Sequence, residues 1–301
     1  MSINRRINFK PVEAEDIPII SPYFAIPDFR TCDFSIGGMF MWRKYFETSY
    51  LLHEDCLFFK IKYFDGQICF TFPLGHISID RSLDLLEEYT INENIDYKFC
   101  TVPEEALSIL LTRYGNRLNA VETRDWFDYL YNMDDLSDLK GNKYSGPRNH
   151  INRFLKLYPH YNYVKINENN IHKVQQFLLD YQGYLLKDGV VAEQEYMRTK
   201  ELLSYFEFFN LFGGYIDIDN KIIAFTIGEV VNDTVFIHVE KALTEYHGAY
   251  QIIAKEFLKQ FHPDAVRYVN REEDVGNLGL RKAKLAYHPI ALLKKFVVSI
   301  K

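Results

Sequence analysis

The stretch NREEDVGNLGLRKAK, residues 270–284, suggests both a fold and a site. It places seven charged side chains and two glycines directly after the short strand-like run 266–269. Charges at the end of a buried strand are costly unless they are paired, solvated or used. In open α/β sheets, ligands bind beside the carboxyl ends of strands. This stretch is therefore the first candidate for a functional site.

The composition is typical of a globular protein: 301 residues, 48% of them hydrophobic and 25% charged. That length suffices for one large domain or two ordinary ones. No apolar run reaches the roughly 18–20 residues that span a bilayer, and the N-terminus lacks the apolar region of a signal peptide. We therefore expect a cytoplasmic protein without a transmembrane segment. The cysteines form no CxxC pair, and we interpret them as small buried hydrophobic residues: Cys32, Cys56, Cys69 and Cys100.

The net charge of -6 hides an uneven distribution. Residues 139–167 contain six Lys or Arg and no Asp or Glu, and residues 275–301 again contain six and none. Two basic stretches on an acidic protein suggest a local anion site rather than a surface that coats nucleic acid. The alternative is two solvated helix faces. If the first interpretation holds, both stretches should converge on one cleft.

Periodicity predicts the order β-α-α-β-β-β-α-β-α-β in the second half of the chain, and a similar order, less clearly, in the first. The second half has predicted strands at 161–166, 211–218, 222–231, 234–242, 266–270 and 290–298, and helices at 171–186, 192–209, 248–261 and 278–285. The first half has predicted strands at 7–11, 49–52, 57–63, 67–72, 97–100 and 126–131, and helices at 13–20, 34–46, 82–93 and 103–114.

We therefore predict an α/β (α+β) protein with two tandem domains, 1–140 and 141–301, and mixed, mostly antiparallel sheets. A linker rich in Asp, Gly, Lys and Ser, at 134–146, joins them. Ser145 is expected to cap a helix that has Pro147 in its first turn. Either Asp274 or Asn277 is expected to cap the short helix 278–285.

The predicted order resembles the GNAT-type N-acyltransferase fold, here in two copies. Four strings resemble a bacterial family of largely unassigned function, similar to the C-terminal catalytic domain of phosphatidylglycerol lysyltransferases. They are LKGNKYSGPRNHINRF (139–154), HVEKA (238–242), HGAYQ (247–251) and NREEDVGNLGLRKAKLAYHP (270–289). Relatives, including Fem-type peptidoglycan aminoacyltransferases, move an amino acid from aminoacyl-tRNA onto an amine or hydroxyl. The resemblance implies a phosphate-bearing donor, tRNA among the candidates, and a small amine, hydroxyl or lipid head-group acceptor.

Acetyl-CoA is disfavoured as the donor. In GNAT enzymes that use it, a Gln/Arg-x-x-Gly-x-Gly/Ala loop cradles the pyrophosphate at a helix N-terminus. Gly248 fits this pattern, but Glu245 brings a negative charge and Tyr250 adds bulk where the backbone should approach the phosphate. Gly248 could still bind another anion. Aminoacyl-tRNA and other acyl donors therefore remain the candidate donors.

The predicted strand 234–242 carries the candidate catalytic residues. Strand alternation puts His238 and Glu240 on one face, so they can share an environment. In GNAT folds a carboxylate on this strand often serves as the base for the attacking amine. The resemblance also places Tyr287 where a general acid is often found. The alternatives are an ion pair of Glu240 with Arg271 or Lys241, and packing roles for His238 and Tyr287.

The candidate binding residues either stabilise the protein itself or grip a charged ligand, with Arg271 and Arg281 as forked donors to its anionic end. They are Arg148, Asn149, Lys241, Gly248, Asn270, Arg271, Glu272, Asp274, Arg281, Lys282 and Lys284. No zinc spacing, nucleophile elbow, Walker loop or dinucleotide fingerprint occurs, so metal, serine-hydrolase, NTPase and dinucleotide functions have no support.

Three functions follow from this sequence. The first is an aminoacyl- or acyltransferase, the second a non-catalytic ligand-binding or regulatory protein on a GNAT fold, and the third an acetyl-CoA-dependent N-acetyltransferase. A carboxylate base within reach of an open tunnel would favour the first. A blocked gap between the two central strands of the second domain would favour the second. The oligomeric state is not predicted.

Overall fold

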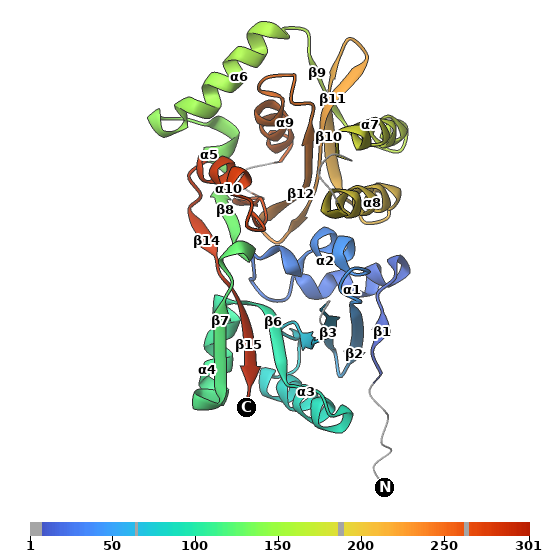
Figure 1. Cartoon of the computed structure of the whole chain (residues 1–301), viewed down its shortest axis with the longest axis vertical. Coiled ribbons are helices and arrows are strands. Elements are labelled where there is room, and N and C mark those ends of the chain that lie inside the picture. The colour runs from blue at the N-terminus through green and yellow to red at the C-terminus, as the bar shows by residue number, and fades with distance from the viewer. Residues whose placement is uncertain (1–7, 64–65, 186–189, 262–264) are drawn as a thin grey trace.

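The computed structural model describes residues 8–63, 66–185, 190–261 and 265–301. The chain forms two lobes, each built on one mixed sheet (Figure 1). This agrees with the predicted α/β class. The turn that would join the predicted strands 57–63 and 67–72, at Asp65-Gly66, lies partly outside the described residues.

The first sheet has the strand order β1-β2-β3-β4-β6-β15-β7, and β5 pairs with β3. Its strands are β1 (Lys10–Pro11), β2 (Ser49–His53), β3 (Cys56–Lys62), β4 (Ile68–Phe70), β5 (Leu74–Gly75), β6 (Lys98–Pro103), β7 (Leu118–Glu122) and β15 (Lys295–Ile300). Helices α1 (Ile17–Phe24), α2 (Ile36–Trp42), α3 (Ile79–Glu93) and α4 (Glu104–Tyr114) belong to this lobe.

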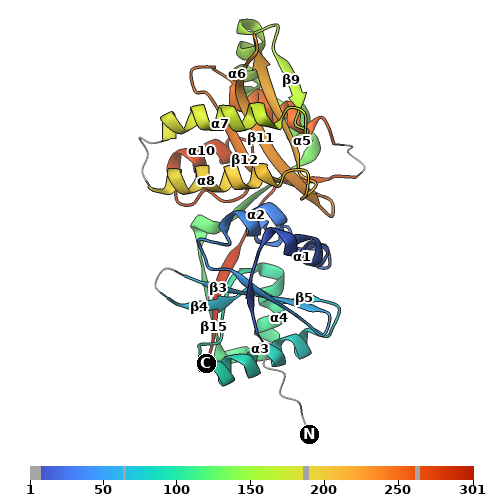
Figure 2. The same cartoon turned by 90° about the vertical axis from the view of Figure 1, so that its right-hand side faces the viewer.

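The second sheet has the order β14-β8-β13-β12-β11-β10-β9. Its strands are β8 (Asp128–Asn132), β9 (Asn162–Lys165), β10 (Phe212–Ile218), β11 (Lys221–Val231), β12 (Thr234–Ala242), β13 (Tyr268–Asn270) and β14 (Ala291–Leu293). The helices of this lobe are α5 (Met133–Asp138), α6 (Ser145–Leu157), α7 (Ile171–Leu185), α8 (Val190–Ser204), α9 (Ala249–Leu258) and α10 (Leu278–Leu285). Helix α9 covers one face of the sheet and α7 and α8 the other (Figures 1 and 2).

The sheets do not coincide with the predicted domains 1–140 and 141–301. Strand β8 pairs with β13 and β14 in the second sheet. Strand β15 crosses back to lie between β6 and β7 in the first sheet. The single strand predicted at 290–298 is therefore wrong: it divides at Lys294 into β14 and β15, one for each lobe. Each lobe needs a segment from the other half of the chain.

Local signals explain where several helices begin. Helix α10 has the predicted bounds, and the side chain of Asn277 caps it by accepting the backbone N–H of Leu280 at 3.0 Å. The capping role predicted for Ser145 is wrong, because a 3-10 turn at Asn142–Tyr144 leads directly into α6. The backbone N–H of Ser145 bonds to the carbonyl of Asn142 instead.

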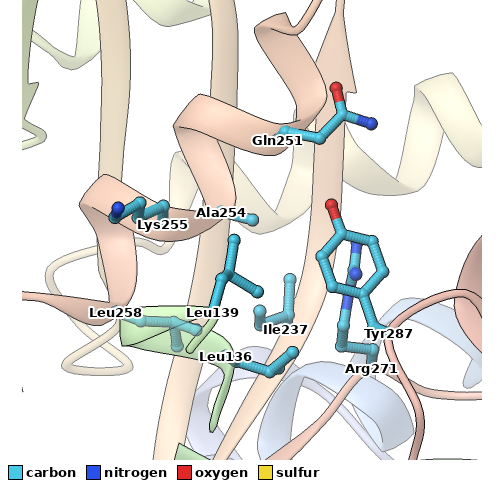
Figure 3. A pocket seen from close by; sticks show the side chains of 9 residues that line it. All are labelled: Leu136, Leu139, Ile237, Gln251, Ala254, Lys255, Leu258, Arg271 and Tyr287. Atoms are coloured by element: carbon cyan, nitrogen blue, oxygen red, sulfur yellow. The ribbon is translucent and has the colours of Figure 1, made fainter. Parts of the chain in front are cut away.

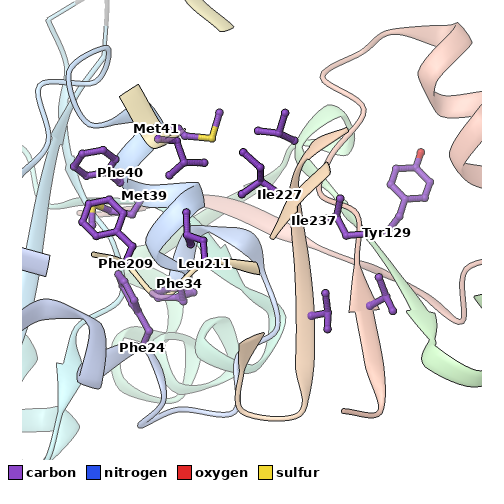
Figure 4. Packing of buried hydrophobic residues seen from close by; sticks show 14 of the residues in the cluster. Phe24, Phe34, Met39, Phe40, Met41, Tyr129, Phe209, Leu211, Ile227 and Ile237 are labelled. Carbon is purple, nitrogen blue, oxygen red and sulfur yellow. The ribbon is translucent and has the colours of Figure 1, made fainter. Parts of the chain in front are cut away.

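The two lobes meet across apolar side chains (Figure 4). Helix α2 of the first lobe brings Phe40 onto Phe209, with ring centroids 4.7 Å apart in an edge-to-face contact. Both side chains are buried. Gly37, at the start of α2, lies so close to β12 that a Cβ there would come within 2.3 Å of the His238 ring. The first lobe therefore packs directly against the strand that carries the candidate catalytic residues.

Candidate functional site

The two central strands of the second sheet separate soon after they meet. Strands β12 and β13 pair in parallel only where 234–236 face 268–270. Beyond this point a small cavity of about 10 Å³ lies between α9, β12 and the segment after β13 (Figure 3). A cavity of that size holds about one water molecule. It is lined by Leu136, Leu139, Ile237, Gln251, Ala254, Lys255, Leu258, Arg271 and Tyr287.

Glu240 is bound through one oxygen only. Its Oε1 accepts a hydrogen bond from Nη2 of Arg271 at 2.9 Å, and the two side chains are 12% and 14% exposed. Its Oε2 is buried, and no donor in the described part of the chain reaches it. Buried polar atoms are nearly always hydrogen-bonded, because an unpaired one costs about 1–3 kcal/mol. The open oxygen therefore needs an explanation.

Tyrosines surround this ion pair. The ring centroid of Tyr287 lies 5.0 Å from the guanidinium carbon of Arg271, and Gln251 and Tyr287 point toward each other in Figure 3. Burial raises the pKa of Tyr287, although Arg271 acts in the opposite direction. Burial and a hydrogen bond with Tyr181 raise the pKa of Tyr250. Both phenols are therefore protonated at neutral pH.

Gln251, Tyr250 and Tyr181 were not predicted as site residues. A signal was present for Gln251, which ends the string HGAYQ. No sequence pattern marks Tyr181. It lies on α7, and only the folded structure brings its phenol to Tyr250 of α9. An open hollow of about 840 Å³ lies beside it, between α7 and the β10–β11 hairpin. Tyr181 lines that hollow and bonds to Tyr250, whose pKa also responds to the charge of Glu240.

His238 and Glu240 do not share an environment, so that prediction is wrong. The register between β11 and β12 shifts by one residue: Ile227 faces Val239, but Gly228 faces Ile237. His238 is the extra residue of this β-bulge, and a bulge interrupts the alternation of side chains. His238 lies against Gly37 of the first lobe, whereas Glu240 contacts Arg271.

Both ring nitrogens of His238 are occupied. Nδ1 lies 2.7 Å from Oε1 of Glu272, and Nε2 lies 2.8 Å from Oε1 of Glu229. Burial alone would lower the pKa of His238, but these two carboxylates raise it to about 10. Glu229 also accepts the backbone N–H of Gly37 at 2.6 Å. A charged imidazole with both nitrogens bonded cannot serve as a base. Through Glu229 it instead links β12 to Gly37 of the first lobe.

Most charges of residues 270–284 stabilise the loop itself. Arg281 binds Asp274 through Nε at 2.9 Å and Nη2 at 2.7 Å. Burial alone would raise the pKa of Asp274, but hydrogen bonds from Arg281 and Tyr129 lower it. Lys284 is buried, and its ammonium donates to the carbonyls of Arg271, Glu272 and Glu273. Arg271, Arg281 and Lys284 are thus occupied by partners within the protein.

The other predicted binding residues fall into two groups. Asn270 is buried and bonds to Asp128 at 2.9 Å, and Lys241 binds Glu195 of α8 at 2.5 Å. Lys282 and Asn149 are exposed, and within the described residues neither side chain has a hydrogen-bond or ion-pair partner. Asn270 is thus buried and Lys241 is paired within the protein, whereas Lys282 and Asn149 face solvent.

The predicted anion site at Gly248 is covered. Gly248 has φ +91° and precedes α9, but a Cβ there would lie 2.5 Å from the carbonyl oxygen of His150 in α6. Arg148 of the same helix donates to the carbonyls of Leu139 and Gly141. The basic stretches do meet, since His288 lies 2.9 Å from the carbonyl of Lys143. Their charged groups, however, do not line the small cavity.

A second buried cluster joins the lobes. Donor atoms of Cys32, Asp33 and Asp128 lie within 4.8 Å of one another, a spacing that could hold a metal ion. The ammonium of Lys295 occupies that position, 2.7 Å from Asp33 and 2.8 Å from Asp128. Burial raises the pKa of Asp128 to about 7. Lys295, the first residue of β15, thus anchors the exchanged strand.

Comparison with known proteins identifies the family. The family described as phosphatidylglycerol lysyltransferase, C-terminal, matches residues 24–299. This chain belongs to that family. A conserved protein of unknown function from Bacteroides thetaiotaomicron is 32% identical, with a TM-score of 0.91 over 98% of this chain and 100% of that one. An uncharacterized protein of Mycoplasmoides gallisepticum is 25% identical over 58% of this chain and 56% of its own length, so the match spans about half of that relative.

More distant structures share the fold. L-PGS from Bacillus licheniformis has a TM-score of 0.66 at 14% identity, over 99% of this chain and 94% of that one. FemX has a TM-score of 0.64 at 7% identity, over 98% of this chain and 97% of that one. The resemblance to lysyltransferase and Fem-type proteins, and the tandem GNAT-type fold, are confirmed. No helix within the described residues is long and apolar enough to cross a membrane.

Proposed function

We propose that this protein is an acyltransferase that moves an aminoacyl group from an activated ester, such as aminoacyl-tRNA, onto an amine or hydroxyl. The family description names a lysyltransferase, which supports aminoacyl transfer as the reaction. The acceptor in this proposal is a small amine, a hydroxyl or a lipid head group. The cytoplasm is the compartment that supplies aminoacyl-tRNA, and we expect the protein to act there.

The open Oε2 of Glu240 carries the proposal. Arg271 binds the other oxygen at 2.9 Å, so the carboxylate is oriented, while no donor among the described residues reaches Oε2. An acceptor N–H or O–H would satisfy that oxygen and be deprotonated by it. General base catalysis of this kind contributes on the order of 10²–10⁴-fold to rate. Arg271 is then a positioning residue, rather than a group that binds the donor.

The transfer step follows from these positions. The acceptor atom attacks the ester carbonyl carbon of the donor while its proton passes to Oε2 of Glu240. The carbon–oxygen bond to the donor breaks, and the departing oxygen takes a proton from the phenol of Tyr287. Exchange with solvent then returns Glu240 to its ionised form and Tyr287 to its protonated form. Burial raises the pKa of Tyr287, so the phenol carries its proton at neutral pH and has one to give.

Substrate binding requires the site to open. The cavity beside Arg271 is only about 10 Å³, which is too small for an aminoacyl group. We propose the hollow of about 840 Å³ as the route, because Tyr181 lines it and bonds to Tyr250, whose pKa is raised by burial and also by the charge of Glu240. In this proposal, movement of these two tyrosines admits the acceptor.

The test is direct transfer. Purified protein is incubated with a pool of tRNA charged with labelled amino acids and with candidate amines, hydroxyl compounds and lipids. Mass spectrometry then searches for a new aminoacyl adduct. We expect label to leave tRNA for one acceptor class at a rate proportional to protein concentration. If no adduct forms and deacylation stays at the rate without protein, the proposal fails.

The closed gap between β12 and β13 favours a second candidate function. A cavity of about 10 Å³ between the central strands suits a protein that kept the fold without catalysis. Such a protein would bind a ligand elsewhere, with Glu240 and Arg271 as a structural pair. Native mass spectrometry of the freshly purified protein distinguishes this case, because a stable ligand would co-purify with it without being consumed.

A further inference from the structure

The hollow of about 840 Å³ between α7 and the β10–β11 hairpin has the size of a ligand site. Pockets that bind small molecules usually measure about 300–1,000 Å³. Three buried residues with apolar bodies line it, Phe177, Tyr181 and Leu243, and the rings of Phe177 and Tyr181 stack with their centroids 5.6 Å apart. This part of the lining can receive the apolar body of a small ligand.

The two walls of the hollow carry charges of both signs. Helix α7 contributes Lys173 and Asp180, and the hairpin contributes Asp217 and Lys221. No ion pair involves any of these four residues within the part of the chain that the structure describes. Nζ of Lys221 lies 5.3 Å from the centroid of the Tyr246 ring, a contact that does not neutralise its charge. All four charges are therefore available to a ligand.

Hydrogen bonds orient the two carboxylates. Oδ1 of Asp180 accepts an amide N–H of Gln176 at 2.9 Å, and Oδ1 of Asp217 accepts the backbone N–H of Asn220 at 3.1 Å. The described residues provide no hydrogen bond for Oδ2 of either aspartate. Each wall thus offers an oriented carboxylate oxygen that can accept a hydrogen bond from a bound cation.

The balance of charge indicates the class of ligand. Two lysines and two aspartates sum to zero, with His172 of the same lining counted as neutral. A phosphate chain or an anionic head group requires an excess of basic residues, which this hollow lacks. A molecule with one ammonium and one carboxylate group can instead bond to both kinds of side chain, and such charge-assisted hydrogen bonds are the strong ones. The simplest molecule that combines these two groups with an apolar body is an amino acid.

The hollow is linked to the surroundings of Glu240. The phenol of Tyr181, in its lining, bonds to Tyr250 of α9. Tyr250 directly precedes Gln251, which lines the small cavity together with Arg271. Two tyrosines in contact therefore connect the hollow with the candidate site.

We propose that the hollow between α7 and the β10–β11 hairpin binds a free amino acid, with its ammonium group at the two aspartates and its carboxylate at the two lysines. This binding does not depend on acyl transfer. One consequence rests on the proposed function: the bound amino acid is then the acceptor, and an amine or hydroxyl on its side chain reaches Glu240 when the two tyrosines move.

Calorimetric titration with each of the standard amino acids tests the binding. The amino acid that binds most tightly is then compared with its amide, which lacks the carboxylate, and with its N-acetyl form, which lacks the ammonium. We expect saturable binding of at least one amino acid. Both blocked forms should bind at least about tenfold more weakly, because each loses one set of charge-assisted hydrogen bonds.

A pair of double variants tests the location. Asp180→Asn/Asp217→Asn keeps the shape of the hollow and removes both of its carboxylates. The control, Glu168→Gln/Asp219→Asn, removes the same two charges from exposed residues that do not line the hollow. The first double variant should bind the amino acid at least about tenfold more weakly than the control. The N-acetyl form, which has no ammonium, should not distinguish the two.

Binding and transfer can be separated. Glu240→Gln should bind the amino acid as tightly as the wild type does, so binding can be found even if acyl transfer never is. The proposal is overturned if no standard amino acid binds at concentrations up to about 10 mM, if the blocked forms bind equally well, or if both double variants lose affinity equally. Transfer to a lipid by a protein that binds no amino acid would also overturn it, while leaving acyl transfer intact.

Discussion

Glu240 and Arg271 form an ion pair that leaves one carboxylate oxygen without a partner in the described part of the chain. A merely structural pair would be more stable with both oxygens bonded, because buried charges need all their hydrogen bonds to offset desolvation. The pair at the lobe interface shows the difference: Arg43 donates to both oxygens of Glu201, at 2.7 and 3.2 Å. The fully bonded Arg43–Glu201 pair suits a structural role, whereas the partly bonded Glu240–Arg271 pair suits a role in chemistry.

His238 should make stability depend on pH. Its pKa is raised from 6.5 to about 10, so the charged imidazole stabilises the fold fully below about pH 6.5. That contribution is lost as the pH rises toward 10, by at most about 1.4 kcal/mol per pH unit. The difference in free energy of unfolding between wild type and His238→Gln should therefore shrink between pH 6.5 and 10.

Denaturant unfolding at several pH values measures this difference. The exposed His160→Gln is the control and should differ from wild type by a constant amount. A difference for His238→Gln that does not change over the range would mean that the imidazole is neutral in the folded protein.

Single elements were predicted well where the signal is local. Helix α10 has the predicted bounds because Asn277 marks its start, and strands β11 and β12 are long segments rich in β-branched and aromatic residues. Strand β7 was missed because its residues are mostly exposed and show little alternation. The bulge at His238 was missed as well, since register depends on the pairing of β11 with β12 rather than on the sequence of either strand.

Strand β15 depends on Lys295. Replacement by Met leaves the carboxylates of Asp33 and Asp128 buried without their ammonium partner, a loss that typically costs about 3–5 kcal/mol. The pKa of Asp128 is already raised to about 7, so without Lys295 these acids should take up protons as the pH falls. The deficit of Lys295→Met should then be smaller at pH 5.5 than at pH 7.5.

The neighbouring Lys294→Met provides the control. The side chain of Lys294 is 42% exposed, and its Nζ lies 3.6 Å from Oε2 of Glu122. Its replacement should therefore change the free energy of unfolding by no more than about 0.5 kcal/mol. Equal effects of the two substitutions at pH 7.5 would show that the buried cluster does not hold β15 in place.

For the whole molecule, the exchange of strands defines what can fold. The segment 1–140 lacks β15, which pairs with both β6 and β7 in the first sheet. We expect this fragment to show no cooperative thermal transition by circular dichroism. The same lobe should regain one when residues 8–127 are joined by a short linker to 294–301. Cooperative unfolding of the fragment 1–140 alone would contradict this.

The uneven distribution of charge is visible in the sequence, but the groups with which each basic residue pairs are not. Residues 275–301 are free of Asp and Glu, which suggested an anion site. Most of their partners come from distant segments: Asp125 binds Arg281, which also pairs with the nearby Asp274, and Asp33 and Asp128 bind Lys295. Only the assembled structure shows that these cations are paired and that the Lys282 side chain has no partner among the residues the structure describes.

The central claim is that Glu240 accepts the proton of the acceptor. Once transfer has been detected, the decisive measurement is turnover of Glu240→Gln against that of Glu201→Gln, with the melting temperature of each. Both substitutions weaken a carboxylate–arginine pair, so we predict melting temperatures within a few degrees of each other. Glu240→Gln should turn over at least about 100-fold more slowly, while Glu201→Gln stays near wild type. Equal turnover in the two variants would contradict the claim and leave Glu240 as a structural residue.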